Sequence, residues 1–348
     1  MSKDLQLLKG LAKRLCETWS PSGEESRIAG VIHSEVLDLV DEVWVDALGN
    51  LIAHKKGNGP KVMVTAHMDE IGVIITHIDE QGFLRFSSIG QNNPDFLLGH
   101  RCRFANGTIG VFGSEPVEPD QKSDVARLYI DIGCYSEQEA RAKVRVGDFA
   151  VYHTGFLDLG KVVVSKALDN RVCCAVLVTV LQELQGITPG NDCFFVFTVQ
   201  EEQGLRGAYT SAYAIDPVYG IALDVTPTGD TPKSRFGDIY MGKGPTVKIT
   251  DRSVICHPQM VKHMAEVAVR EEIPYQIEVL AGGGTDIGAI HITRAGVVCG
   301  GISIPWRHFH SASEMVDIDD VVNCIKLLKA VLLSEFPKVV SGSDWFTE

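Results

Sequence analysis

Apolar and polar positions at the start of the chain recur at helical spacing. A leucine stripe over residues 5–15 predicts an opening helix that ends near residues 19–23. Ser22 and Glu25 stand three residues apart, which is the spacing of a capping box, so we expect a second helix whose apolar stripe runs over residues 28–39. The chain therefore opens with two amphipathic helices.

Short apolar runs come next and have the composition of strands. Residues 43–46 and 50–54 predict two strands joined by a turn at Leu48-Gly49. Lys61–Ala66 is rich in β-branched residues and predicts a buried strand that ends just before His67. An imidazole therefore directly follows a buried strand.

The pattern changes between about residues 70 and 157, where β-like runs alternate with glycine, proline and asparagine. Helical periodicity is nearly absent, and turn signals recur about every 8–12 residues, which indicates a small all-β unit. The β-like runs are residues 83–87, 101–104, 108–112 and 128–132.

Alternation of strand and helix patterns resumes after residue 158. The expected strands are residues 162–164, 193–199, 220–223, 246–250, 276–279 and 297–300, and the expected helices are residues 170–184, 205–213, 259–272 and 318–334. We therefore expect an α/β fold: a mixed sheet with helices on both faces, formed by residues 1–69 and 158–348 and interrupted by an inserted β-rich domain of residues 70–157.

The composition excludes some classes of partner and compartment. With 45 acidic and 32 basic residues, the chain has a formal net charge of −13, which argues against nucleic-acid binding. The nine cysteines show no C-x-x-C spacing and lie mostly in apolar runs, as small core residues do in a reducing compartment. The N-terminus lacks an apolar signal core, and no run approaches the roughly 18 apolar residues of a membrane span. We therefore expect a soluble cytoplasmic protein without membrane contact.

Polar side chains that can bind metal occur where buried strands end, which is where open α/β sheets place their ligands. His67 and Asp69 are two apart in an extended segment and so point the same way. A metal-binding histidine usually donates its second ring N–H to a carboxylate, and Asp69 is placed to accept it. The alternative is a turn-capping aspartate beside a structural histidine.

Three more carboxylates have similar positions. Asp169 immediately precedes a predicted helix, where it would either cap the helix or bridge two metals with its two oxygens. Glu201 and Glu202 follow the apolar run Cys193–Val199. Adjacent carboxylates at a buried strand end are costly unless paired or metal-bound, so one would bind a metal and the other act as general base. The alternative is a solvated acidic start of a helix.

Asp224 closes another apolar strand, and His308 and His310 lie in a later polar segment. The residue types alone do not choose between the two histidines. Two histidines and three carboxylates, with one carboxylate shared, supply three ligands to each of two ions. Nitrogen and oxygen ligands without a thiolate suit zinc, cobalt or manganese and leave positions open for water and substrate.

The order and spacing of these motifs resemble a known family. The motifs are His67-Met68-Asp69-Glu70-Ile71-Gly72, Leu168-Asp169-Asn170-Arg171, Gln200-Glu201-Glu202 with Gly204-Leu205-Arg206-Gly207, Leu223-Asp224-Val225-Thr226, Gly283-Gly284-Thr285-Asp286 and His310-Ser311. Nearly end to end, the chain resembles the glutamyl aminopeptidase, or TET, family of dinuclear metallo-aminopeptidases.

The resemblance implies two divalent metal ions per subunit, zinc or cobalt and in some cases manganese. It implies that His67, Asp169 and Asp224 hold one ion, and that Asp169, Glu202 and His310 hold the other. It thereby selects His310 from the two candidate histidines.

The resemblance also implies roles for residues that bind no metal. Glu201 would be the general base and Asp69 the partner of His67, while Thr285 and Asp286 become candidate substrate-binding residues. The β insertion would be a dimerisation domain, and dimers would assemble into tetrahedral dodecamers, so we expect a homo-oligomer.

The expected function is removal of N-terminal residues from peptides by a water that two metal ions activate, with Glu201 accepting its proton. Three alternatives stay open: a dinuclear-metal deacylase or deacetylase of N-acyl substrates, a glycosidase, and a non-enzymatic metal-dependent scaffold. A glycosidase needs two carboxyl groups across a sugar and gives no reason for the accompanying histidines.

Overall fold

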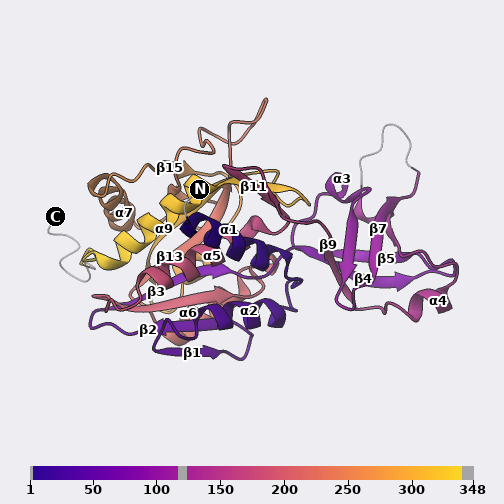
Figure 1. Cartoon of the computed structure of the whole chain (residues 1–348), viewed down its shortest axis with the longest axis horizontal. Coiled ribbons are helices and arrows are strands. Elements are labelled where there is room, and N and C mark those ends of the chain that lie inside the picture. Colours follow the sequence, from indigo (N-terminus) through magenta and orange to yellow (C-terminus); the bar gives the residue numbers. More distant parts are fainter. Residues whose placement is uncertain (1–2, 117–123, 339–348) are drawn as a thin grey trace.

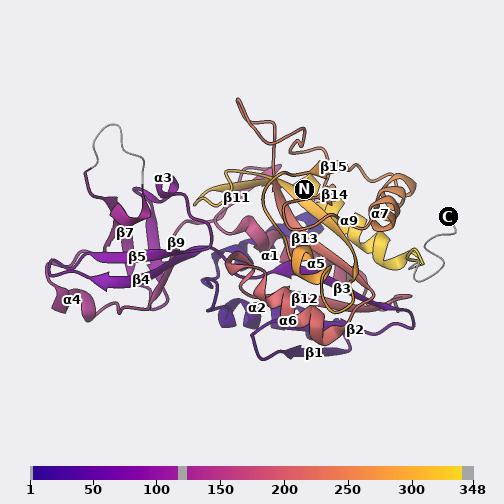
Figure 2. The same cartoon turned by 180° about the vertical axis from the view of Figure 1, so that it is seen from behind.

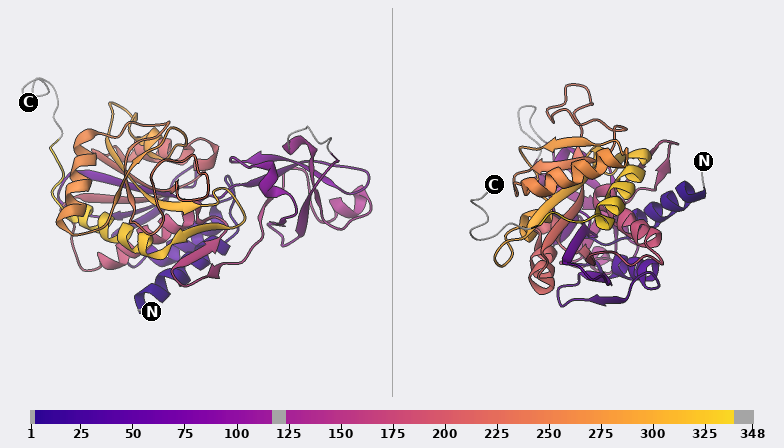
Figure 3. Two further views of the ribbon diagram at one scale, coloured as in Figure 1. Left: turned by 90° about the horizontal axis from the view of Figure 1, so that it is seen from above. Right: turned by 90° about the vertical axis from the view of Figure 1, so that its left-hand side faces the viewer.

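The computed structural model describes residues 3–116 and 124–338 and contains a large α/β body with a smaller β-barrel to one side (Figure 1). The view from behind (Figure 2) and the view from above (Figure 3) show the same separation. The expected fold class, a mixed sheet interrupted by a β-rich unit, is confirmed.

The large sheet has the order β1-β2-β12-β3-β13-β16-β17-β11-β10, with β14 paired to β16 and β15 paired to β14. Its centre is parallel: β3 lies between β12 and β13, and β13 pairs with β16. The carboxyl ends of these four strands therefore meet at one edge of the sheet, which is the usual position of a site in this architecture. The strands are β1 (Glu42–Val45), β2 (Leu51–Lys55), β3 (Lys61–His67), β10 (Leu157–Asp158), β11 (Val162–Ser165), β12 (Asp192–Thr198), β13 (Tyr219–Pro227), β14 (Thr246–Thr250), β15 (Gln276–Val279), β16 (Val298–Arg307) and β17 (Glu314–Asp317).

Helices cover both faces of this sheet, as expected. The helices α1, α2, α5, α7 and α9 share one apolar core with the sheet, and α6 and α8 share another core with its opposite face. α5 is buried on nearly all sides, because its residues after the first turn are almost all apolar. The helices are α1 (Lys3–Glu17), α2 (Ser26–Val36), α5 (Leu168–Glu183), α6 (Arg206–Ile215), α7 (Pro258–Arg270), α8 (Ile287–Ile290) and α9 (Ile318–Leu333).

The inserted unit is a closed six-stranded barrel with an apolar core of its own. The four β-like runs seen in the sequence correspond to β5, β6, β7 and β8, whereas β4 and β9 were not predicted. These two strands close the barrel by pairing with each other, Val73 opposite Ala150, a long-range contact that no local pattern reveals. The elements are β4 (Gly72–Ile78), β5 (Leu84–Ile89), α3 (Pro94–Leu97), β6 (Arg101–Phe104), β7 (Ile109–Ser114), β8 (Leu128–Asp131), α4 (Glu137–Arg141) and β9 (Phe149–Tyr152).

The capping-box prediction is wrong in its contacts. α2 begins at Ser26, and its preceding residue Glu25 makes no side-chain capping bond. Ser22 donates instead to Asp69 at 2.6 Å, and Glu25 accepts the backbone N–H of Gln200 at 3.1 Å. Ser22 thus binds a distant segment, and Glu25 binds the distant N–H of Gln200 as well as that of Gly23, at 2.8 Å.

Two bulk expectations can be compared with the structure directly. All nine cysteines are free and buried, in keeping with their apolar sequence surroundings. Within residues 3–116 and 124–338, no helix combines the length and the apolar character that crossing a membrane requires.

Candidate metal centre

The candidate ligands gather at the carboxyl edge of the central strands. His67 is the last residue of β3, and Asp224 lies in β13, two residues beyond Ala222, which pairs with Thr65. Glu202 belongs to a single 3₁₀ turn that follows β12. Side chains from strand ends that are far apart in the sequence therefore lie together at the carboxyl edge of the sheet.

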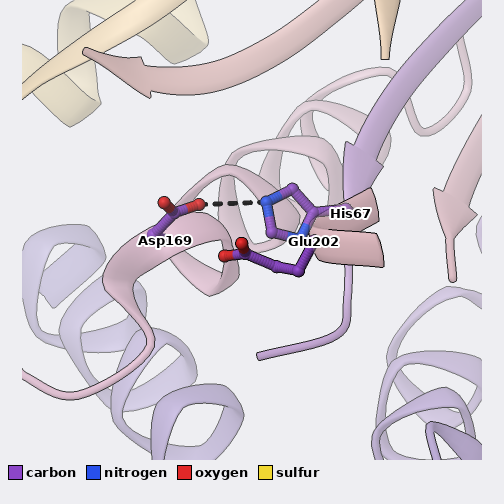
Figure 4. A group of neighbouring side chains, drawn as sticks. All are labelled: His67, Asp169 and Glu202. Carbon is purple, nitrogen blue, oxygen red and sulfur yellow. Dashed lines mark hydrogen bonds and ion pairs between the residues drawn. The ribbon is translucent and has the colours of Figure 1, made fainter. Parts of the chain in front are cut away.

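The carboxylate of Asp169 lies between two imidazoles. Its Oδ1 is 2.9 Å from His67 Nε2, and its Oδ2 is 3.3 Å from His310 Nε2. Figure 4 shows Asp169 pointing towards His67, with Glu202 beside both. One ligand atom from each of His67, Asp169 and Glu202 lies within 4.8 Å of the others, which is compact enough to hold a metal ion. Asp169 thus has the two-sided geometry of a bridging ligand.

The capping alternative for Asp169 finds no support. Asp169 and Asn170, at the start of α5, have non-helical dihedral angles, and the carboxylate of Asp169 faces the two histidines rather than the first N–H groups of the helix. The backbone N–H of Asp169 donates to Glu314, a buried carboxylate, at 3.0 Å. The peptide bond from Asp169 to Asn170 is cis, and the side-chain amide of Asn170 donates to the carbonyl of Leu223 at 2.8 Å.

Asp69 contacts the histidine and both glutamates. Its Oδ1 lies 3.2 Å from His67 Nδ1 and accepts the backbone N–H of Glu201 at 3.1 Å. Its Oδ2 accepts the backbone N–H of Glu202 at 3.3 Å and the hydroxyl of Ser22 at 2.6 Å. Nδ1 of His67 thus faces Asp69, and Nε2, on the other side of the ring, faces Asp169, which is the side where a metal ion would bind.

His310 is oriented by the segment of residues 90–91, which directly follows strand β5 of the barrel. Its Nδ1 lies 2.9 Å from the carbonyl oxygen of Gln91, and its Nε2 lies 3.4 Å from Glu202 Oε1. The structure therefore brings His310 to the cluster. A Cβ on Gly90 would come within 3.1 Å of Glu202 Oε2, so this segment also limits the space around the glutamate.

The site concentrates negative charge in a buried place. Burial, and then the charges of Asp224 and Glu202, raise the pKa of Glu201 well above its usual value. Burial and the charge of Asp169 do the same to the pKa of Asp224. Burial would also raise the pKa of Asp169, but the two histidines outweigh it and hold this pKa below its usual value. A cation bound among these groups would relieve the repulsion.

The two candidate substrate-binding residues lie beside this cluster and are buried. Asp286 is 2% exposed and accepts the hydroxyl of Thr198 at 2.7 Å. The hydroxyl of Thr285 is buried and has no hydrogen-bond partner among the described residues. Oδ1 of Asp286 likewise has no hydrogen-bond partner among the described residues, so each of the two residues carries an unpaired buried polar atom.

Sequence reasoning did not anticipate four residues that touch the cluster: Ser22, Glu25, Gln91 and Glu314. Ser22 and Glu25 were noticed, but as a local helix start. Gln91 acts through its carbonyl oxygen, which carries no residue-type signal. Glu314 lies only four residues after His310, yet its contact with the backbone of Asp169 depends on the pairing of β17 with β11.

Comparisons with known proteins show what the chain as a whole is similar to. Residues 49–327 match the model of the M42 glutamyl aminopeptidase family. A relative from Acetivibrio thermocellus is 48% identical over 91% of this chain and 96% of its own, and a lysyl aminopeptidase from Pyrococcus furiosus is 37% identical over 92% and 96%. The TET1 peptidase of Pyrococcus horikoshii, which assembles into a tetrahedron or a large octahedral shell, superposes with a TM-score of 0.85 at 32% identity, covering 94% of this chain and 100% of its own.

Proposed function

The chain belongs to the M42 glutamyl aminopeptidase family, and from this premise we propose that it removes N-terminal residues from peptides with two divalent metal ions held by five side chains. One observation carries the proposal. The two oxygens of Asp169 face two different imidazoles, 2.9 Å from His67 and 3.3 Å from His310, as a carboxylate shared by two ions would. Family membership makes the chain a hydrolase of peptide bonds that depends on a divalent metal.

The donor set fits such ions. His67, Asp169 and Asp224 would hold one ion, and Asp169, Glu202 and His310 would hold the other. Imidazole and carboxylate donors without a thiolate suit zinc, cobalt or manganese. The raised pKa values of Asp224 and Glu201 support this assignment, because burial and crowding of like charges call for a compensating cation.

When bound, the ions would act as Lewis acids that lower the pKa of a water molecule and polarise the scissile carbonyl. Glu201 would accept the proton of that water on its carboxylate and deliver it to the leaving amine. Its Oε2 lies 3.9 Å from His67 Nε2, so it borders the cluster, and its backbone is held by Asp69. Asp69 would keep the ring of His67 in place and raise its basicity as a ligand.

Selection of N-terminal residues would follow from charge. The protonated α-amine of a peptide is attracted by the excess of carboxylates around Asp224 and Glu202. An internal peptide bond carries no positive charge and is not attracted in this way. We propose that Thr285 and Asp286, each with a buried polar atom that has no hydrogen-bond partner among the described residues, bind the substrate.

The barrel would mediate self-association. The chain resembles peptidases that form large assemblies, which is consistent with a homo-oligomer. We propose that the inserted unit of residues 70–157 is the dimerisation domain and that dimers build a dodecamer. Nine free, buried cysteines support function in the reducing cytoplasm.

A dinuclear deacylase is the nearest alternative, because the same two-metal chemistry would cleave an N-acyl amide. Aminoacyl chromogenic substrates, followed by release of the chromophore, and their N-acetylated forms, followed by release of acetate, separate the two. Each would be assayed after chelation and after re-addition of zinc, cobalt or manganese. We expect metal-restored activity on the free aminoacyl substrates alone; restored activity on the N-acetylated forms alone would replace this proposal with the deacylase.

A further inference from the structure

The turn that carries Glu201 and Glu202 presents three consecutive backbone N–H groups, and each is received by a buried carboxylate. The N–H of Gln200 donates to Glu25 Oε1 at 3.1 Å. The N–H groups of Glu201 and Glu202 donate to the two oxygens of Asp69, at 3.1 and 3.3 Å. Two carboxylates from separate parts of the chain thus hold the backbone of this turn.

The first residue of the turn has a conformation that needs such support. Gln200 has a φ of 53° and a ψ of 36°, in the left-handed region that residues with a Cβ adopt at an energetic cost. A strained conformation of this kind persists only when its surroundings fix it. The direction in which the next two side chains leave the backbone depends on it.

Glu25 is itself rigidly placed. It is 6% exposed, it directly precedes α2, and its Oε1 also accepts the backbone N–H of Gly23 at 2.8 Å. It also lines a hollow of about 460 Å³ whose walls include Val45 and Val199. Because methionine has about the length of glutamate, a Glu25→Met substitution changes the hydrogen bond more than the packing.

We propose that Glu25 is a positioning residue for the reaction: by receiving the N–H of Gln200, it holds the turn so that Glu201 and Glu202 face the metal centre. The inference rests on the proposed function of that centre. Glu25 would act indirectly, through the backbone of Gln200, and would contact neither an ion nor the substrate.

The chain offers a conservative substitution and a control. Burial, together with the charge of Asp69, raises the pKa of Glu25 to about 7, so the acid and the carboxylate both occur near neutral pH. Both forms keep an oxygen acceptor, and so does the amide in Glu25→Gln. Glu25→Met has a similar length and no oxygen. Glu24→Met makes the same change at the exposed neighbouring residue.

The test combines turnover with metal binding. The full-length variants would be compared in kcat and KM, and in Zn²⁺ and Co²⁺ affinity of the chelated protein by calorimetry. We expect Glu25→Met to lose about 10- to 100-fold in kcat and about 10-fold in metal affinity, with KM within about threefold. Glu25→Gln should stay within about threefold of the wild type in kcat, KM and metal affinity. Glu24→Met should match the wild type in the same quantities.

Two outcomes would overturn the inference: wild-type kcat and metal affinity in Glu25→Met, or an equal loss in Glu25→Gln. If Glu25→Met does not fold, Glu25→Ala, which also lacks the acceptor oxygen, takes its place, and wild-type kcat and metal affinity in Glu25→Ala would overturn the inference. A wild-type protein without aminopeptidase activity would end the proposed function alone, since the metal affinities would still test the role of Glu25.

Discussion

The backbone N–H of Glu201 donates to Asp69 Oδ1 at 3.1 Å, although the two residues are 132 positions apart in the sequence. The same oxygen lies 3.2 Å from His67 Nδ1. One buried carboxylate therefore sets the position of the proposed base relative to a proposed metal ligand. A displacement of Glu201 or of His67 would therefore also shift the other residue through Asp69. The three residues form one connected unit rather than a set of independent side chains.

Glu201→Gln should separate proton transfer from metal binding. The amide cannot accept the proton of the water, but the residue is not among the proposed ligands. We expect kcat to fall about 10²- to 10⁴-fold while the metal content stays that of the wild type. Steady-state kinetics and elemental analysis measure both. Glu202→Gln, at the next position, should lose metal instead. A near-normal kcat in Glu201→Gln would show that Glu201 is not the base.

Metal binding should stabilise the fold, because the ions relieve repulsion among buried carboxylates. At a free metal concentration of 100 times Kd, binding adds about 2.7 kcal/mol to the free energy of unfolding. Thermal denaturation of chelated protein should therefore shift upwards when zinc or cobalt returns, and the shift should shrink in His310→Ala. An identical melting temperature with and without metal would show that these side chains hold no ion.

The contribution of Asp320 to the stability of the folded protein should fall as the pH rises from about 4 to about 6. This buried carboxylate accepts the N–H groups of Gly242 and Gly244 at 2.6 and 2.7 Å. Burial raises its pKa from 3.8 to about 6. Since the folded pKa lies above the unfolded one, the protonated form favours folding, and this contribution is lost as the pH rises through about 6.

Asp320→Asn removes this titration and provides the check. Relative to the wild type, the free energy of unfolding of the variant should rise by roughly 2 kcal/mol between pH 4 and pH 7. Urea titrations at both pH values measure the difference. Parallel pH profiles of the two proteins would contradict the assignment.

Lys248 should be required for stability. Its ammonium contacts Glu278 and lies 3.2 Å from Asp251, and all three side chains are almost fully buried. Lys248→Met would leave two uncompensated carboxylates in the interior, at a cost of about 3–5 kcal/mol. Lys262→Met is the matched control, because Lys262 and Glu266 form an exposed pair worth less than about 1 kcal/mol. Chemical denaturation measures the free energy of unfolding of both variants. Equal losses in Lys248→Met and Lys262→Met would contradict the prediction.

Much of the fold could be predicted because it follows local periodicity. The leucine stripe of α1, the apolar run of β3 and the helix α9 each lie within a few residues of their predicted bounds. The barrel was recognised from its turns, yet β4 and β9 were missed, because their pairing joins the two ends of the insertion. β17 was missed for a similar reason: it is four residues long and pairs with β11 and β16, both distant in sequence.

By itself, the sequence determined which side chains could bind metal, since imidazoles and carboxylates stand where buried strands end. Only the tertiary structure decided how they meet: that Asp169 turns its two oxygens to different histidines, that the carbonyl of Gln91 orients His310, and that Glu25 serves the turn before Glu201 rather than its own helix. The physical reason is that residue type and periodicity are local properties of a chain. Hydrogen bonds to distant backbone groups arise only when separate strands are packed into one sheet.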